Sequence, residues 1–312
     1  MKKLIKLIRN FGFLFTFKYC FYKFTKQNDK YIKLIYDYLS KFLQPIIKKY
    51  NEDEDSFLEK QKSNYIWTCW WQGYQMMPDL CKKCYDNLKS ILDKNFELIL
   101  ITKDNYSKYV DIPNIIIEKL NLGLITITQF SDVLREALIV QNGGTWIDVS
   151  VWCTPNINNY LHLDLEFWSV KLFEVYDNSN IGQLISNCMW SGFILSGVKN
   201  SLVLRFALDS MIYYYSNYSM MIDYFMQNLI IRIAYENISK IRSIIDDVSF
   251  SNPNLYVLYP YMNCPYDEHI WLYLTSSTCF FKLTQKCSYL EQNGTSFTFY
   301  HRLFNDVVKD VN

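Results

Sequence analysis

The sequence predicts an α/β fold with a mainly parallel sheet, preceded by a helical extension. From about residue 63, short apolar runs alternate with segments whose apolar residues recur every three or four positions. This βαβα order is typical of a parallel sheet with helices on both faces, because parallel strands need long crossover connections. Half of the 312 residues are hydrophobic, which is enough for a sizeable core. Ligands of such sheets bind at the carboxyl ends of the strands.

Residues 1–60 are predicted to form the N-terminal extension, and residues 61–312 the main domain. Residues 1–26 mix Lys and Arg with Leu, Ile and Phe, and their longest uncharged run is too short to span a bilayer. No small-residue cleavage site follows this run, so a signal peptide is not expected. Such a basic amphipathic segment can bind an anionic membrane surface or pack on the main domain, and the sequence leaves both open.

A second amphipathic helix is predicted over residues 31–50, interrupted near Pro45, and a polar linker over residues 51–55. In the main domain, the predicted strands cover residues 65–69, 96–101, 145–152, 166–171 and 190–196. The predicted helices begin at Pro78 and Gln129 and cover residues 114–120, 201–215 and 220–235.

The segment from Gln129 to Val151 carries the most information. Asp132 and Arg135 are three positions apart and share one helix face, opposite an apolar face. That apolar face consists of Phe130, Val133, Leu134, Ala137 and Leu138. Two glycines, 143 and 144, end the helix, and a strand is expected to follow in which Asp148 and Ser150 share a face. A carboxylate in an apolar strand is normally paired or functional, so Asp148 is a candidate site residue.

Composition and motifs exclude several classes of function. The net charge of +1 gives no field for nucleic acid, so no nucleic-acid partner is expected. Nine scattered cysteines fit a reducing cytoplasm better than a disulfide framework. The lone Cys81–Cys84 pair and three dispersed histidines do not indicate a zinc site. The sequence has no GxSxG or Cys–His signature of a hydrolase.

Several short motifs occur in a fixed order. They are Ile66-Trp67, Lys103-Asp104-Asn105, Phe130-Ser131-Asp132 with Arg135, and Gly143-Gly144-Thr145-Trp146-Ile147-Asp148, with weaker pieces at Trp190–Phe193, Asp223–Phe225, Lys282-Leu283 and Gly294-Thr295. In this order the chain resembles the bacterial capsular polysaccharide synthesis glycosyltransferases, relatives of the DXD sugar transferases of glycosyltransferase family 32. The resemblance implies a GT-A-type nucleotide-diphospho-sugar transferase fold with a Rossmann-like sheet.

The resemblance also implies an activity. A hexose or N-acetylhexosamine would pass from a nucleotide sugar, such as a UDP-sugar, to a capsular or other surface glycan, with retention of configuration. The acceptor could be carried on a polyprenyl lipid, and the protein would lie in the cytoplasm, peripherally on the inner face of the membrane. Two alternatives are an inactive sugar-nucleotide-binding relative and a scaffold of a polysaccharide assembly complex.

By resemblance, Asp148 is the first Asp of the DXD motif and contacts ribose or a Mn²⁺ or Mg²⁺ ion. Ser150 replaces the second Asp, and a hydroxyl is a weaker metal ligand. Asp132 and Arg135 would face the donor and complete the catalytic set with Asp148. His301 is a late residue that would complete the metal site, with a plain surface or core role as the alternative.

The residues expected to bind the donor, besides Asp132, Arg135 and Asp148, are Trp67, Trp71, Asp104, Asn105, Ser131, Gly144, Trp190 and Ser191. Each also has a simpler interpretation. Trp67 lies within a strand and suits the core, whereas Trp71 suits a loop contact to the base. The Asp104-Asn105 pair is typical of a turn. Asp132 and Arg135 could form an ion pair on a solvated helix.

Overall fold

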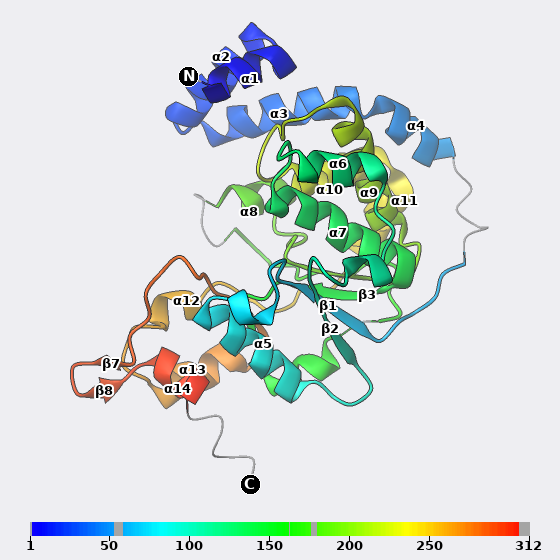
Figure 1. Ribbon diagram of the computed structural model, residues 1–312. Helices are drawn as coiled ribbons and strands as arrows, with labels where there is room; N and C mark the ends of the chain where they lie inside the picture. The colour runs from blue at the N-terminus through cyan, green and yellow to red at the C-terminus, as the bar shows by residue number, and fades with distance from the viewer. Residues whose placement is uncertain (1, 53–58, 162, 176–179, 306–312) are drawn as a thin grey trace.

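The computed structural model describes residues 2–52, 59–161, 163–175 and 180–305 as a mixed α/β fold (Figure 1). Its helices are α1 (Lys2–Phe11), α2 (Phe13–Phe24), α3 (Asn28–Phe42), α4 (Gln44–Glu52), α5 (Asp79–Ile91), α6 (Asn114–Asn121), α7 (Ile127–Asn142), α8 (Ile181–Ser186), α9 (Leu202–Asn217), α10 (Met226–Asn237), α11 (Ser239–Asp246), α12 (Leu258–Tyr261), α13 (Glu268–Thr275) and α14 (Phe299–Asn305). Its strands are β1 (Tyr65–Cys69), β2 (Glu97–Ile101), β3 (Gly144–Ile147), β4 (Val151–Cys153), β5 (Ile194–Gly197), β6 (Phe280–Lys282), β7 (Gln292–Asn293) and β8 (Ser296–Phe297).

The central sheet has the strand order β2-β1-β3-β5. Strand β1 is parallel to β2 and β3, and β5 runs antiparallel at the edge beside β3. Helices α6, α7, α9 and α10 lie on one side of this sheet and α5 lies on the other (Figure 1). The predicted mainly parallel α/β sheet with helices on both faces is therefore confirmed.

The predicted strand over residues 145–152 is wrong in its length. Strand β3 ends at Ile147, a turn follows, and β4 begins at Val151 in a second sheet, where it pairs antiparallel with β6. The backbone N–H of Asp148 donates to the carbonyl of Phe193, and the N–H of Val151 donates to the carbonyl of Asp148, which closes the turn. Asp148 and Ser150 therefore lie in a turn at the carboxyl end of β3 and not along one strand face.

A second predicted strand, over residues 166–171, is also wrong. This segment makes only an isolated bridge, between Trp168 and Ser196, beside the edge strand β5. The segment is nonetheless buried from residue 167 to residue 172. Burial of its apolar side chains explains the strand-like pattern, although the backbone does not form a ladder.

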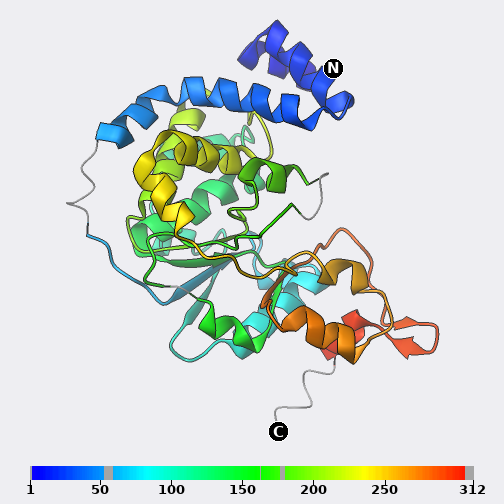
Figure 2. The same cartoon turned by 180° about the vertical axis from the view of Figure 1, so that it is seen from behind.

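Of the four N-terminal helices, α3 and α4 pack on the main domain, α2 packs on α3, and α1 packs on α2. Helix α3 crosses α10, and α4 lies on α9, as both cartoon views show (Figure 2). Ile35, Leu39 and Leu43 are fully buried in the same hydrophobic cluster as the central sheet. The helix predicted over residues 31–50 breaks at Leu43, two residues before Pro45, as expected. Most of the predicted linker over residues 51–55 lies outside the described residues, so a boundary near residue 60 stays a prediction.

Helix α7 begins and ends at strong local signals. Thr126 and Gln129 form a reciprocal capping box at its start, which gives Gln129 a structural role. Gly143 ends the helix with a φ of 74°, as predicted. Gly144 has a φ of 104°, and a Cβ atom there would lie 2.4 Å from the carbonyl oxygen of Tyr65. These two glycines let the chain turn directly from α7 into β3.

Candidate functional site

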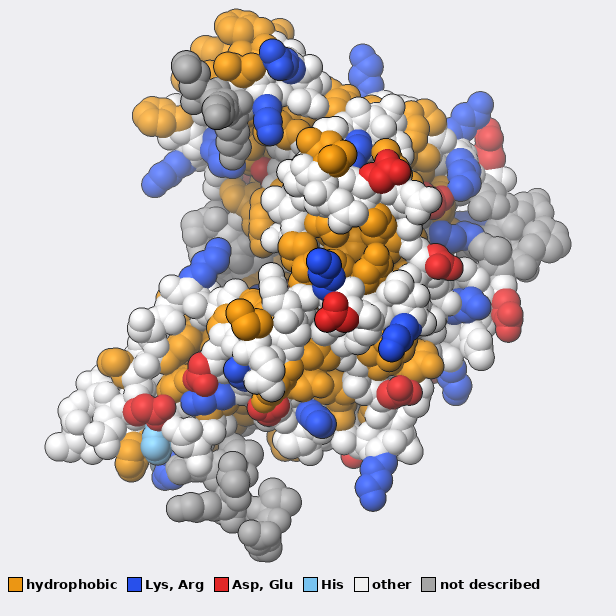
Figure 3. Space-filling view, viewed as in Figure 1, with side chains coloured by type: hydrophobic (Ala, Val, Ile, Leu, Met, Phe, Trp, Pro, Cys, Tyr) orange, Lys and Arg blue, Asp and Glu red, His pale blue; other side chains and the backbone are white. Residues whose placement is uncertain are grey.

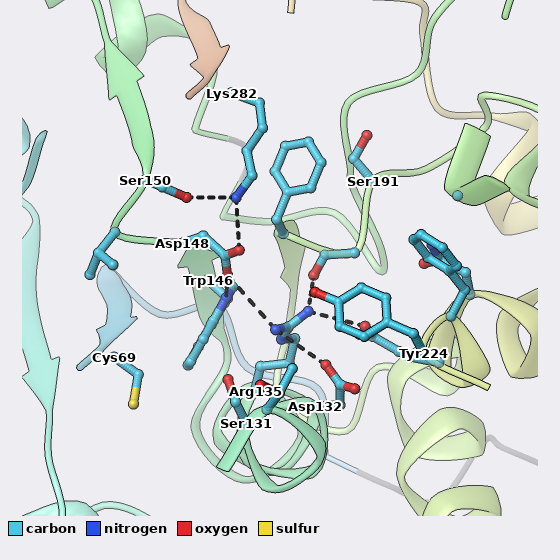
Figure 4. Close-up of a pocket in the computed structure, with 18 of the residues that line it drawn as sticks. Cys69, Ser131, Asp132, Arg135, Trp146, Asp148, Ser150, Ser191, Tyr224 and Lys282 are labelled. Carbon is cyan, nitrogen blue, oxygen red and sulfur yellow. Dashed lines mark hydrogen bonds and ion pairs between the residues drawn. The ribbon is translucent and has the colours of Figure 1, made fainter. Parts of the chain in front are cut away.

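A cavity of about 650 Å³ opens where β1 and β3 end (Figure 4). Cys69 is the last residue of β1 and Asp148 follows β3, and both line the cavity. Its other walls come from α7, from the loop before β5, from the start of α10 and from β6. This position agrees with the general rule that open α/β sheets bind ligands beyond the carboxyl ends of their strands.

Arg135 of α7 connects two carboxylates across the cavity floor. Its Nη2 atom lies 3.3 Å from Oδ1 of Asp132 and 3.8 Å from Oδ1 of Asp148. Its Nη1 atom donates to the carbonyl of Gly192 and, at 3.0 Å, to Oε1 of Gln227. The Arg135 side chain is only 9% exposed and both of its terminal nitrogens are engaged, so Arg135 holds the carboxylates in place.

Asp148 is held by three side chains. The indole N–H of Trp146 donates to its Oδ1 at 2.8 Å, and the ammonium of Lys282 lies 3.0 Å from its Oδ2. Burial alone would raise the pKa of Asp148, but Lys282 and then Arg135 outweigh burial and hold that pKa below its usual range. Asp148 is therefore ionised at neutral pH, with a fixed orientation.

Lys282 comes from β6, and the pairing of β6 with β4 brings it to the turn after β3. Its Nζ atom also donates to Oγ of Ser150 at 2.7 Å and lies 4.6 Å from the centre of the Phe193 ring. The Lys282 side chain is 23% exposed, so it keeps access to the cavity. No role was predicted for this lysine, although its motif was recognised, because no local pattern connects it to Asp148 across 134 positions.

Asp132 has a different environment from Asp148. Burial, opposed by Arg135 and reinforced by Asp148, raises the pKa of Asp132 to about 6. Two carboxylates that share one guanidinium thus differ in their readiness to take a proton. Asp148 stays charged, whereas Asp132 can exchange a proton near neutral pH.

The structure brings most of the predicted site residues together. The predicted residues that line the cavity are Trp71, Ser131, Asp132, Arg135, Asp148, Ser150, Trp190 and Ser191. Lining residues that the sequence analysis did not select include Tyr224, Gln227, Asn228 and Lys282. They come from the second half of the chain, where side-chain pattern alone does not reveal which helix or strand faces the sheet.

Four predicted donor contacts lie outside the cavity lining. Trp67 is fully buried in the core, and its Nε1 donates to the carbonyl of Gly143 at 2.9 Å. Gly144 is packed against Tyr65 as described above. Asn105 holds a turn, because its side chain accepts from the backbone of Thr102 and donates to that of Leu100, and Asp104 is exposed beside it. For Trp67 and for the 104–105 pair, the simpler interpretations match the structure.

His301 also lies away from the cavity. Its Nδ1 is 2.6 Å from Oε2 of Glu291, and its ring stacks on Phe297 at 4.0 Å, in the C-terminal part of the chain. It cannot complete a metal site with Asp148 in this arrangement, because its partners hold it in a separate cluster. The structure therefore does not bring His301 together with the other predicted metal ligands, Asp148 and Ser150.

The remaining residues do not fit the Mn²⁺ or Mg²⁺ site that the resemblance implies. The two oxygen donors of the altered DXD motif, on Asp148 and Ser150, both bind the Lys282 ammonium. The other cavity carboxylate, Asp132, pairs with Arg135. Among the described residues, no group of three or more His, Cys, Asp or Glu side chains is placed to hold a metal ion. A lysine thus occupies the place between the two expected ligands.

Two residues of the cavity wall each carry a buried polar atom that makes no hydrogen bond within the described structure. Among the residues that the structure describes, no partner is found for the buried indole N–H of Trp190 or for Oδ1 of Asn228. Buried polar groups are normally hydrogen-bonded, and an exception at a cavity wall is a natural contact for a bound molecule. Trp190 and Asn228 thus each have an unpaired hydrogen-bonding atom buried close to the cavity.

A sequence model of the family described as "Capsular polysaccharide synthesis protein" matches residues 17–303. The match covers most of the chain, including the cavity residues, and the chain therefore belongs to this family. The comparison with curated proteins found no match. Within the described residues, no helix is both long enough and apolar enough to cross a bilayer.

Proposed function

We propose that this member of the capsular polysaccharide synthesis family is a glycosyltransferase with a GT-A-type fold. It would move a hexose or N-acetylhexosamine from a nucleotide-diphospho-sugar, such as a UDP-sugar, to a capsular or other surface glycan. The observation that supports this proposal best is the meeting of Asp148, Arg135 and Lys282 in one cavity at the carboxyl ends of β1 and β3. The family's part in polysaccharide synthesis makes glycosyl transfer the fitting chemistry.

The cavity suits such a donor in size and in chemistry. Its volume of about 650 Å³ lies within the range of small-molecule and cofactor sites. Two cations, Arg135 and Lys282, can balance a diphosphate, while Asp132, Asp148 and Ser131 offer acceptors for sugar hydroxyls. Trp71 supplies an aromatic wall, which stands against Tyr106 and Phe130 at centre distances of 5.3 and 4.9 Å.

The setting in the cell follows as part of the same proposal. A capsular glycan is built on the cytoplasmic side of the membrane when its donor is a cytoplasmic nucleotide sugar, so the enzyme would work there. A polyprenyl-linked acceptor would place it at the inner membrane face. Retention of configuration is proposed from the family resemblance, and the anomeric form of the product, read by NMR, tests it.

A panel of nucleotide sugars tests the function. The measured quantities are nucleoside diphosphate release and thermal stabilisation of the full chain, for the wild type, Asp148→Asn and Asp104→Asn. We expect one donor to be turned over, with release at least about a hundredfold lower in Asp148→Asn, because the charge that orders Arg135 and Lys282 is lost. Asp104→Asn is the matched control, since Asp104 is exposed and outside the cavity.

The same panel distinguishes the two alternatives. Donor stabilisation without release, in the presence of a glycan acceptor, would indicate a sugar-nucleotide-binding relative. No response to any donor would contradict the donor site and favour a scaffolding role. The replacement of the second DXD aspartate by Ser150 is the specific observation that favours the binding-only alternative.

A further inference from the structure

We propose that the Lys282 ammonium supplies the positive charge at the donor diphosphate and that the reaction needs no divalent cation. This inference rests on the proposed function and deepens it. Lys282 Nζ lies 3.0 Å from Asp148 and 2.7 Å from Ser150, the two positions that would ligate a metal in a DXD transferase.

The charge balance of the cavity supports this assignment. The described lining residues carry two carboxylates, Asp132 and Asp148, and two cations, Arg135 and Lys282. Asp148 is therefore already neutralised, and a divalent ion beside it would be repelled by an ammonium a few ångströms away. The four groups together carry no net charge, and Lys282 is the cation that stands where the resemblance places the metal ion.

Of the two cations, Lys282 is the more exposed to an incoming diphosphate. Arg135 is 9% exposed and binds Asp132, Gly192 and Gln227, whereas Lys282 is 23% exposed at the cavity surface. An ammonium has three N–H donors, and two of them bind Asp148 and Ser150. The third can bind a phosphate oxygen while the first two hold the group in place.

The step that this charge assists is transfer of the glycosyl group from the diphosphate to the acceptor hydroxyl. The bond between the anomeric carbon and the diphosphate oxygen breaks, and its electron pair goes to that oxygen. The acceptor hydroxyl oxygen forms the new bond to the anomeric carbon, and its proton passes to the leaving diphosphate and then to water. The negative charge thus grows on the diphosphate, where a fixed cation stabilises the transition state more than the ground state.

The test uses the full chain in EDTA and, separately, with added Mn²⁺. UDP and UMP binding is measured by calorimetry, and nucleoside diphosphate release is measured for the donor panel. The variants are Lys282→Met, Lys282→Arg and the control Lys286→Met, an exposed lysine that does not line the cavity. Circular dichroism and the melting temperature establish that each variant is folded.

We expect release in EDTA within about twofold of release with Mn²⁺. Lys282→Met should bind UDP at least about tenfold more weakly and lose most of its preference for UDP over UMP, because the missing contact is to the diphosphate. Added Mn²⁺ should not restore UDP binding to Lys282→Met. Lys282→Arg should retain part of the activity, and Lys286→Met should match the wild type.

Release that appears only with Mn²⁺ would overturn the inference and leave the proposed function standing. Wild-type UDP binding by folded Lys282→Met would overturn it as well. If no donor is bound or turned over in either condition, the proposed function fails, and the inference fails with it.

A separate observation carries a second proposal: we infer that the outer face of α1 and α2 binds an anionic lipid bilayer. Helix α2 is apolar on both faces. Its inner face packs on α3, where Phe15 meets Tyr38 at a centre distance of 4.9 Å and Tyr19 meets Tyr31 at 5.2 Å. The large apolar residues exposed on the two helices are Leu4, Ile5, Phe13, Leu14, Phe17, Phe21 and Phe24.

The exposure of these side chains is high for an apolar face. Phe13, Leu14 and Phe24 are 72%, 66% and 88% exposed. Hydrophobic side chains gather over these N-terminal helices in the space-filling view, with Lys and Arg beside them (Figure 3). An exposed apolar patch of this kind marks an interaction site, so this face is expected to contact an apolar environment outside the chain.

The positive charge of the N-terminal segment favours an anionic bilayer as the partner of this apolar face. Residues 1–28 contain seven Lys and Arg and no Asp or Glu. Of these, Lys6, Arg9, Lys18, Lys23 and Lys26 are exposed. A second copy of the chain would bring an equally basic face and be repelled, whereas anionic headgroups attract it and the acyl region receives the Phe and Leu side chains.

Flotation of the full chain with vesicles tests this proposal. Phosphatidylcholine vesicles with and without phosphatidylglycerol are compared, at low and high salt. We expect binding to the anionic vesicles, weakened by salt, and at least about tenfold weaker for the double variant Phe13→Ser with Phe17→Ser. The matched control is Met76→Ser with Leu122→Ser, which removes two apolar side chains that are 68% and 72% exposed elsewhere.

Three outcomes would overturn the bilayer as the occupant. The first is equal flotation of the Phe13→Ser, Phe17→Ser variant and the wild type, and the second is no flotation of the wild type. The third is a wild-type dimer, seen by light scattering, that the same double variant dissociates, which would assign the face to a second copy.

Discussion

The side-chain amide of Gln227 donates a hydrogen bond to Oε1 of Glu136, and both side chains lie in the interior next to the cavity floor. The carbonyl oxygen of the same Gln227 accepts from Arg135 at 3.0 Å. Glutamine thus connects the guanidinium that holds both cavity carboxylates to a carboxyl group that is fully buried. Among the described residues, no partner is found for the second carboxyl oxygen of Glu136.

This environment predicts a pH-dependent stability. Burial, opposed by Gln227 and Arg135, raises the pKa of Glu136 from 4.5 to about 8. Between these values the folded protein keeps the proton and the unfolded chain loses it, so the free energy of unfolding falls as pH rises through this window. We expect a loss on the order of 3 kcal/mol between pH 5 and pH 8.

The variant Glu136→Gln checks this prediction by urea unfolding at both pH values. The glutamine cannot ionise and can still accept from Gln227, so its stability should change much less across the window. Comparison of the two proteins cancels the contribution of Asp132, whose raised pKa is common to both. Parallel pH profiles for the wild type and Glu136→Gln would show that Glu136 is not the group responsible.

A second prediction concerns the turn from α7 into β3. Gly144→Ala should be strongly destabilising, because its Cβ would lie 2.4 Å from the backbone oxygen of Tyr65 at a φ of 104°. Gly73→Ala is the matched control, since Gly73 has a φ of 84° and open space around it. The control should cost about 1–3 kcal/mol from strain alone, and Gly144→Ala about 2 kcal/mol more, measured by urea unfolding. Equal losses would mean that the contact with Tyr65 relaxes freely.

The sequence predicted the elements around the site better than the contacts within it. Strand β1 and helix α6 lie almost where hydrophobic periodicity placed them, because each is a continuous run with local end signals. The prediction of a single strand over residues 145–152 failed because the alternating pattern continues through the turn after β3. Both β3 and β4 are buried, so their pattern does not show that they belong to different sheets.

Prediction of the site's side chains was likewise limited to what a short segment of sequence shows. Asp132, Arg135 and Asp148 were selected from one short segment, where spacing on a helix and a carboxylate among apolar residues are visible locally. Lys282 and Gln227 reach the site through strand pairing and helix packing over long sequence separations. Such pairing depends on the whole fold, and a single sequence does not encode it in any short pattern.

A third prediction concerns the attachment of the N-terminal helices. The hydroxyl of Tyr31 on α3 donates to the carboxylate of Asp223, and both residues are buried. Tyr31→Phe leaves one oxygen of Asp223 without this donor and should lower the free energy of unfolding by about 1–3 kcal/mol. Donor release per folded molecule should not change, because neither residue lines the cavity.

The control for Tyr31→Phe is Tyr36→Phe on the same helix. The Tyr36 hydroxyl accepts from Asn237 at 3.2 Å in an exposed setting, so its loss should cost less than about 1 kcal/mol. Urea unfolding measures both variants. A loss for Tyr31→Phe no larger than that for Tyr36→Phe would show that the buried pair adds nothing to the docking of α3.

The last prediction compares two buried tryptophans. Trp190 and Trp152 are each 3% exposed, and within the described part of the chain neither indole N–H has a partner. Trp190 lines the cavity, whereas Trp152 lies in a separate core cluster with Phe281.

Replacement by Phe removes the N–H and part of the ring in both, so the two variants should lose similar stability, about 1–2 kcal/mol each. Only Trp190→Phe should weaken donor binding, by about tenfold, because Trp190 lines the cavity and its unpaired N–H could turn to a ligand oxygen, whereas Trp152 does not line the cavity. Calorimetry with the donor found in the panel measures this difference. Unchanged donor affinity in Trp190→Phe would place the bound donor away from that wall, and an equal loss in Trp152→Phe would attribute the effect to general loosening of the fold.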